Sequence, residues 1–199
     1  MSVPNNRTLE AILLIAVLLL SGCSSMRLVD SDVTAFAAWT TAPPGPGTRY
    51  QFERLPSQTA ATQPDRIEAL ATTSLAKVGL ALSPQGADYG VQVLLSTEVV
   101  PRNSAVGFGG SGVFMSGGGF GSSLGLSFPI GSGEPYFRRS LTVLMRDLKT
   151  QKVVFETRAQ HDGFGADAFA VLPAMLDSAL LGFPQPPQGT RKINVEIPK

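Results

Sequence analysis

The chain has 199 residues, of which 43% are hydrophobic and 16% are charged, so it can bury a substantial core in one domain or a small pair of domains. Its net charge of +1 is far from the strongly basic balance that is typical of nucleic-acid-binding domains. One Cys and one His exclude an internal disulfide, a cysteine-cluster metal site and a multi-histidine metal site. We therefore expect no nucleic-acid partner, no metal and no cofactor.

Residues 1–22 have the features of a lipoprotein signal peptide. Ala11–Leu20 is a run of ten apolar residues, which is too short to span a bilayer and is typical of the apolar region of a signal peptide. Leu20, Ser21 and Gly22 then precede Cys23, as in a bacterial lipobox, where small side chains let a peptidase reach the backbone. The alternatives are a plain secretory signal with an incidental Cys and an uncleaved anchor.

The lipobox predicts an acylated N-terminus. After cleavage, the Cys23 thiol would carry diacylglycerol and its amine a third chain such as palmitate, and two or more chains hold a protein stably on a membrane. Bacterial lipoproteins with Asp after the Cys tend to stay in the inner membrane, so Ser24 implies the periplasmic face of the outer membrane. We assign residues 23–32 to the acylated N-terminus and its tether, and residues 33–199 to a single α+β domain.

The first half of this domain alternates short strands with one helix. The alternation of polar and apolar residues predicts strands over 29–39, 49–54 and 87–100. The 3.6-residue spacing of apolar side chains predicts a helix over 65–78. Asp65 and Glu68 have the spacing of a capping box, and Gly79 suits a left-handed residue at the C-terminal end of the helix.

The second half predicts a hairpin, a helix and an edge strand. Strict alternation over 136–147 and 152–160, joined by a turn at 148–151, is typical of paired antiparallel strands, and 161–165 reads as a loop. A helix follows over 168–181, which either kinks at Pro173 or starts there. Alternation over 191–197 predicts a last edge strand. The whole order predicts an α+β fold, a mixed sheet with both helices packed on one face.

A Gly-rich segment over 103–133 interrupts the sheet between two strands. It contains 11 Gly, no charged residue and four regularly placed aromatic side chains, Phe108, Phe114, Phe120 and Phe128. It can be a flexible loop, an interaction loop with the four Phe as apolar anchors, or an uncharged hairpin that would need an oligomeric pore to pair its edges in lipid. The sequence leaves the oligomeric state open. Gly107–Gly112 spells a dinucleotide-binding pattern, but no helix-forming residues follow it.

The sequence resembles small Gram-negative lipoproteins built on a conserved domain of unknown function. The resemblance rests on Phe36 and Trp39, Tyr50–Phe52, the helix ending at Val78-Gly79-Leu80, the Gly-rich segment, the hairpin strands up to Arg158, and Ala179–Pro184. It implies a lipid anchor and this α+β fold. It implies no activity and no catalytic residue.

Few residues suggest chemistry. His161 beside Asp162 could be a base and its orienting carboxylate in a small hydrolase, or part of a ligand site, but no motif supplies a nucleophile. We expect Arg138, Arg139 and Arg146 to be exposed charges on a strand face rather than an anion site. The sequence thus predicts a non-enzymatic lipoprotein, an envelope scaffold or assembly protein that acts through protein partners.

Overall fold

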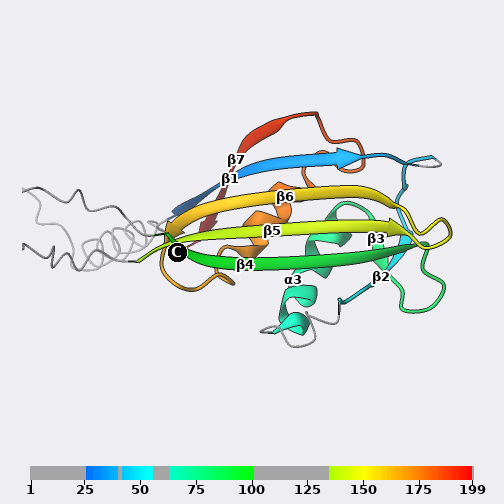
Figure 1. Cartoon of the computed structure of the whole chain (residues 1–199), viewed down its shortest axis with the longest axis horizontal. Helices are drawn as coiled ribbons and strands as arrows, with labels where there is room; N and C mark the ends of the chain where they lie inside the picture. Colours follow the sequence, from blue (N-terminus) through cyan, green and yellow to red (C-terminus); the bar gives the residue numbers. More distant parts are fainter. Residues whose placement is uncertain (1–25, 40–41, 56–62, 101–134, 199) are drawn as a thin grey trace, which may run out of the picture.

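The computed structural model in Figure 1 describes residues 26–39, 42–55, 63–100 and 135–198. Seven strands form one sheet in the order β3-β2-β4-β5-β6-β1-β7. Four neighbouring strands of 12 residues dominate it, namely β4 (Tyr89–Val100), β5 (Tyr136–Asp147), β6 (Val153–Phe164) and β1 (Met26–Ala37). Each of these strands is antiparallel to its neighbour.

Shorter strands complete both sides of the sheet. β2 (Thr48–Phe52) pairs in parallel with β4, and β3 (Leu80–Leu82) pairs in parallel with β2. β7 (Thr190–Pro198) pairs antiparallel with β1 and forms the opposite edge. The sheet is therefore mixed, and the predicted α+β fold and the predicted edge strand are confirmed. The short β3 was not predicted.

Both helices, α3 (Pro64–Lys77) and α4 (Leu172–Leu180), lie behind the sheet in Figure 1. Gly79 has a φ of +88°, which confirms its predicted left-handed role after α3. Pro173 lies in the first turn of α4, so the helix starts there and does not kink. The start is later than the predicted residue 168 because residues 168–171 form turns.

The core lies between the helices and the inward side chains of the long strands. On β5 and β6, alternate residues are buried, including Leu141, Val143 and Met145 on β5 and Phe155 on β6. The intervening side chains point to the other face of the sheet, which neither α3 nor α4 covers in Figure 1. This single-sided burial explains why alternation predicted these strands well.

Two strand boundaries differ from the sequence analysis by three residues or more. β1 begins at Met26, so residues 26–32, which we assigned to the tether, belong to the sheet and pair with β7. Their alternation buries Val29 and Ser31, which gives this segment a place in the core. β6 continues to Phe164, so residues 161–164 are strand and not loop, because they pair with Tyr136–Arg139 of β5.

The Phe155 ring anchors an aromatic cluster in the core. It stacks on Trp39 with ring centroids 6.0 Å apart and meets Phe183 edge-on at 5.0 Å. Trp39 also donates a hydrogen bond from Nε1 to the Pro184 carbonyl oxygen at 2.8 Å. The cluster therefore joins the segment after β1 to β6 and to the segment after α4.

We predict that Phe155→Ala lowers the free energy of unfolding by about 3–5 kcal/mol, because it leaves a cavity in this cluster. Chemical denaturation monitored by Trp39 fluorescence measures the loss. Phe36→Ala is the matched control, since Phe36 is also a strand residue but is 60% exposed. Equal losses in the two variants would contradict the assigned core.

Candidate functional site

One end of the sheet carries most of the features that could bind a ligand. At this end β1 begins with Met26, β4 ends, β5 begins and β6 ends, on the left in Figure 1. We call it the Met26 end. Large hydrophobic side chains are exposed there, namely Met26, Leu28, Val99 and Phe164. Val100 and Tyr136, which flank the Gly-rich segment, are paired with each other at the same end.

His161 lies at the Met26 end and is buried, with only 4% of its surface exposed. Its Nδ1 is 2.6 Å from the backbone oxygen of Asp30, so Nδ1 carries the proton and donates it. Its Nε2 is buried and has no hydrogen-bond partner. His161 is therefore a buried side chain of β6, whereas the sequence analysis places it in a loop.

His161 is not part of a catalytic dyad with Asp162. Neighbouring strand residues start toward opposite faces of a sheet, and among the described residues no hydrogen bond joins the Asp162 carboxylate to His161, although both line one pocket. Instead, the carboxylate accepts hydrogen bonds from Arg138, whose Nη2 is 2.9 Å from Asp162 Oδ2. These bonds hold the pKa of Asp162 below its usual value. Asp162 is therefore an ion-pair partner of Arg138 on the outer face.

Arg139 was predicted to be an exposed charge, and this prediction is wrong. Its side chain is fully buried, because Arg139 continues the inward series of Leu141, Val143 and Met145 along β5. It lies directly opposite His161 in the β5–β6 register. Its Nη2 donates to the Gly165 carbonyl oxygen, whereas its Nε and Nη1 have no partner.

The charge of Arg139 is held in unfavourable surroundings. Burial lowers the pKa of its guanidinium, and the Arg27 charge lowers it further, while Asp167 acts in the opposite direction. An arginine in a protein nevertheless stays protonated at neutral pH. Ser31 of β1 is also buried and inward-facing, with an unpaired Oγ. Ser31, His161 and Arg139 thus form a polar row across three neighbouring strands.

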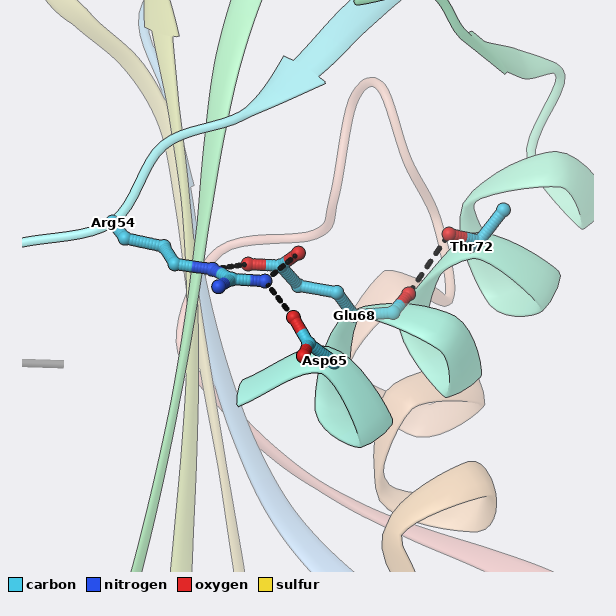
Figure 2. Close-up of polar contacts among 4 residues, drawn as sticks. All are labelled: Arg54, Asp65, Glu68 and Thr72. Carbon is cyan, nitrogen blue, oxygen red and sulfur yellow. Dashed lines mark hydrogen bonds and ion pairs between the residues drawn. The ribbon is translucent and has the colours of Figure 1, made fainter. Parts of the chain in front are cut away.

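A second polar cluster clamps the start of α3 to the segment after β2 (Figure 2). Arg54 donates from Nε and Nη2 to the two carboxylate oxygens of Glu68, at 2.6 and 2.7 Å, and from Nη2 to Asp65 at 2.5 Å. These bonds raise the pKa of Arg54. The predicted capping box is therefore wrong: the N-cap residue is Gln63, it makes no side-chain cap, and both carboxylates bind Arg54 instead.

A cavity of about 430 Å³ lies beside this clamp. Its lining includes Arg54, Glu68, Val93, Leu95 and Phe169. The Arg54 donors that face Glu68 and Asp65 are already paired, and no buried unpaired polar atom among the described residues belongs to the lining. The clamp therefore has a structural role in joining α3 to the sheet.

Several predicted site residues lie outside the described residues. They are the cleavage residues Leu20, Ser21 and Gly22, the lipid-attachment residue Cys23, and the aromatic residues Phe108, Phe114, Phe120 and Phe128. Within the described ranges, no three His, Cys, Asp or Glu residues gather into a group that could hold a metal ion. In the same ranges no helix is both long and apolar enough to cross a membrane.

The geometry defines an α+β domain with a one-sided mixed sheet and a polar row at one strand end. Residues 29–185 match the model of a domain of unknown function, DUF4136. The chain therefore belongs to the DUF4136 family. No curated protein sequence matches the chain.

The comparison with solved structures includes two proteins that match at low sequence identity. A PDZ domain protein from Parabacteroides distasonis has a TM-score of 0.52 and 11% identity, covering 91% of this chain and 41% of that one. The PelC dodecamer from Paraburkholderia phytofirmans has a TM-score of 0.43 and 15% identity, covering 75% of this chain and 94% of that one. The first similarity supports the fold alone, and this chain spans less than half of that protein.

We predict that Asp162→Asn destabilises the protein at pH 7 and that this difference closes in acid. Arg138 lowers the folded-state pKa of Asp162. The carboxylate therefore contributes to the stability of the fold above the unfolded pKa of about 4, and this contribution is lost as the pH falls through the lower folded value. Thermal unfolding of wild type and variant between pH 7 and pH 2 measures the gap. Asp32→Asn, an exposed position on β1, should show no comparable closing gap.

Proposed function

We propose that this DUF4136 protein is a non-enzymatic lipoprotein, anchored through Cys23 to the periplasmic face of the outer membrane, where its domain serves as a scaffold or assembly protein. The observation that carries the proposal is the position of β1. β1 begins at Met26, only three residues after the lipobox Cys23. Three residues of extended chain reach roughly 10 Å, so an acylated Cys23 would hold the Met26 end against the membrane surface.

The exposed apolar side chains at the Met26 end support this orientation. Met26, Leu28, Val99 and Phe164 are large hydrophobic residues with more than a third of their surface exposed. The burial of apolar side chains in the interfacial region of a bilayer is favourable, and it adds to the membrane affinity of the acyl chains. The opposite end of the sheet has instead the polar turn after Asp147, whose carboxylate accepts hydrogen bonds from the backbone N–H groups of Lys149 and Thr150.

The proposed partners are envelope proteins, and the Gly-rich segment is the proposed contact. This segment leaves the sheet after Val100 and returns before Tyr136, both at the Met26 end. Its aromatic residues Phe108, Phe114, Phe120 and Phe128 are the side chains that we propose for this contact. Aromatic side chains are enriched among residues that dominate protein–protein binding energy.

We also propose that the domain catalyses no reaction. His161 is the residue that the sequence offered as a base, and its Nδ1 is occupied by the Asp30 carbonyl oxygen. Ser31 is the hydroxyl opposite it on β1, yet no hydrogen bond joins Ser31 Oγ to His161. A Ser–His nucleophile requires such a bond, so the hydrolase alternative receives no support from this geometry.

We predict that mass spectrometry of the protein isolated from membranes finds an N-terminus at Cys23 that carries diacylglycerol and an amide-linked acyl chain. Cys23→Ala should abolish labelling with radioactive palmitate, because the variant has no thiol to acylate. Ser25→Ala, two residues further along, is the matched control and should be labelled normally. An unmodified thiol at Cys23, or a mature start elsewhere, would contradict the proposed anchor.

We predict that cross-linking in intact envelopes captures a reproducible protein partner, and that replacing Phe108, Phe114, Phe120 and Phe128 together by Ala weakens this capture at least tenfold. Removing several aromatic anchors costs about 2 kcal/mol or more each at an interaction hot spot. Western blotting of membrane fractions checks that the variant stays anchored. The failure of any partner to appear under all growth conditions tested would reject the scaffold role.

A further inference from the structure

A pocket of about 510 Å³ opens at the Met26 end, and the scaffold role does not use it. Its lining includes the basic residues Arg27 and His161, the acidic residues Asp30 and Asp162, and also Leu28, Tyr136, Gly163, Phe164 and Gly165. Arg139 lies directly behind this lining, since it is the register partner of His161 and donates from Nη2 to the Gly165 carbonyl oxygen. Three basic side chains from three strands therefore meet around one pocket.

The buried groups at this pocket have unfilled hydrogen-bonding capacity. Arg139 keeps one N–H on Nε and two on Nη1 without a partner, and the side chain is fully buried. His161 Nε2 is likewise buried and unpaired. Leaving a buried polar group unpaired costs about 1–3 kcal/mol, and more for a charged one. A ligand that fills these positions would recover part of this cost.

Gly163 keeps the space next to His161 Nε2 free. A Cβ at Gly163 would lie 2.8 Å from that nitrogen, which is closer than real side chains approach. A side chain at position 163 would therefore have to displace the His161 imidazole. Nε2 can accept a hydrogen bond from a protonated ligand oxygen or, as an imidazolium, donate one.

The two acidic residues of the lining, Asp30 and Asp162, each have a cationic partner. Asp162 is paired with Arg138, and the Asp30 carboxylate lies 3.7 Å from Lys192 Nζ and 3.6 Å from His161 Nδ1. Asp167 offsets part of the Arg139 charge, but it is exposed, and its Oδ1 accepts from the Phe169 N–H. In the described part of the chain no carboxylate forms an ion pair with Arg27 or Arg139. Arg27 in the lining and Arg139 beside it therefore remain available to an anionic ligand.

We infer that this pocket binds a phosphate group, with Arg27 and His161 in contact with its oxygens and Arg139 supplying charge and N–H donors from behind. A tetrahedral oxyanion suits donors that come from β1, β5 and β6, because its oxygens point in several directions. A phosphate can come from a phospholipid head group or from free phosphate, and both sources share this chemistry. The inference does not depend on the proposed scaffold role.

The test uses the full chain purified in a neutral detergent and phosphate-free buffer, titrated with inorganic phosphate or with dihexanoyl phosphatidylglycerol below its micelle concentration. Calorimetry and the thermal unfolding midpoint report binding. We expect saturable binding of at least one probe, weakened tenfold or more in Arg27→Gln and in Arg139→Met, since a hydrogen bond to a charged group contributes about 1.5–3 kcal/mol. Gly163→Ala should weaken binding without removing a charge.

Matched controls separate a site from general charge and from a purely structural role. Arg158→Gln removes an exposed arginine of β6, and Gly45→Ala adds a Cβ where nothing lies within 4 Å. Both should bind like wild type. Arg139→Met should raise or preserve the thermal unfolding midpoint measured without phosphate, but it should lose the increase in midpoint that phosphate gives to the wild type. Replacing an arginine with a purely structural role would leave that increase in place.

The two probes also distinguish the source of the phosphate. Binding of phosphatidylglycerol alone assigns the site to lipid head groups, and binding of inorganic phosphate assigns it to the free anion. Absence of binding by either probe overturns the inference. Equal binding by wild type, Arg27→Gln and Arg139→Met overturns it as well, and so does an equal loss in Arg158→Gln.

Discussion

A mismatch in length between strands and helices governs this structure. Four neighbouring strands have 12 residues each, which corresponds to about 40 Å of strand. The helices that cover the inward face have 14 and 9 residues, about 21 and 13 Å. The helices cannot cover the whole sheet, so inward side chains toward the Met26 end need another environment. At that end, inward positions change from Leu141 and Ala159 to Arg139 and His161, while Thr97 and Val99 of β4 are exposed.

The same constraint explains what the sequence predicted well. Alternation is a reliable signal where one face of a strand is buried and the other is not, and this holds for β5 and β6, while the inward residues of β7 are only partly buried. β3 has three residues, which is too short for any periodic pattern. The capping box failed for a different reason: Asp65 and Glu68 bind Arg54, which lies 11 and 14 residues away in sequence. Local spacing contains no information about such a partner.

The polar row was only half visible in the sequence. The alternation over 136–147 already aligned Arg139 with Leu141 and Val143, but the residue type argued for exposure, since arginine is rarely buried unless it is paired. The alternation over 152–160 predicts a strand that ends at Gln160, which places His161 in a loop. The row could have been predicted from the alternation of the strands, if the alternation had been given more weight than the residue type. The unpaired atoms and the space beside Gly163 depend on side-chain packing and are visible only in the structure.

The two ends of the sheet differ in how completely their polar groups are satisfied. At the turn between β5 and β6, the Asp147 carboxylate accepts from two backbone N–H groups, Gln151 donates to the Leu148 carbonyl oxygen, and Arg146 pairs with Glu53. At the Met26 end, buried donors of Arg139 and the Nε2 of His161 lack partners. Folding alone favours the first arrangement, because unsatisfied buried groups reduce stability. Four of the seven buried unpaired side-chain atoms in the described part of the chain belong to Ser31, Arg139 and His161, and the others belong to Tyr50, Ser178 and Arg191. The first four lie toward the end with exposed apolar side chains, which is what a surface that meets something outside the domain would require.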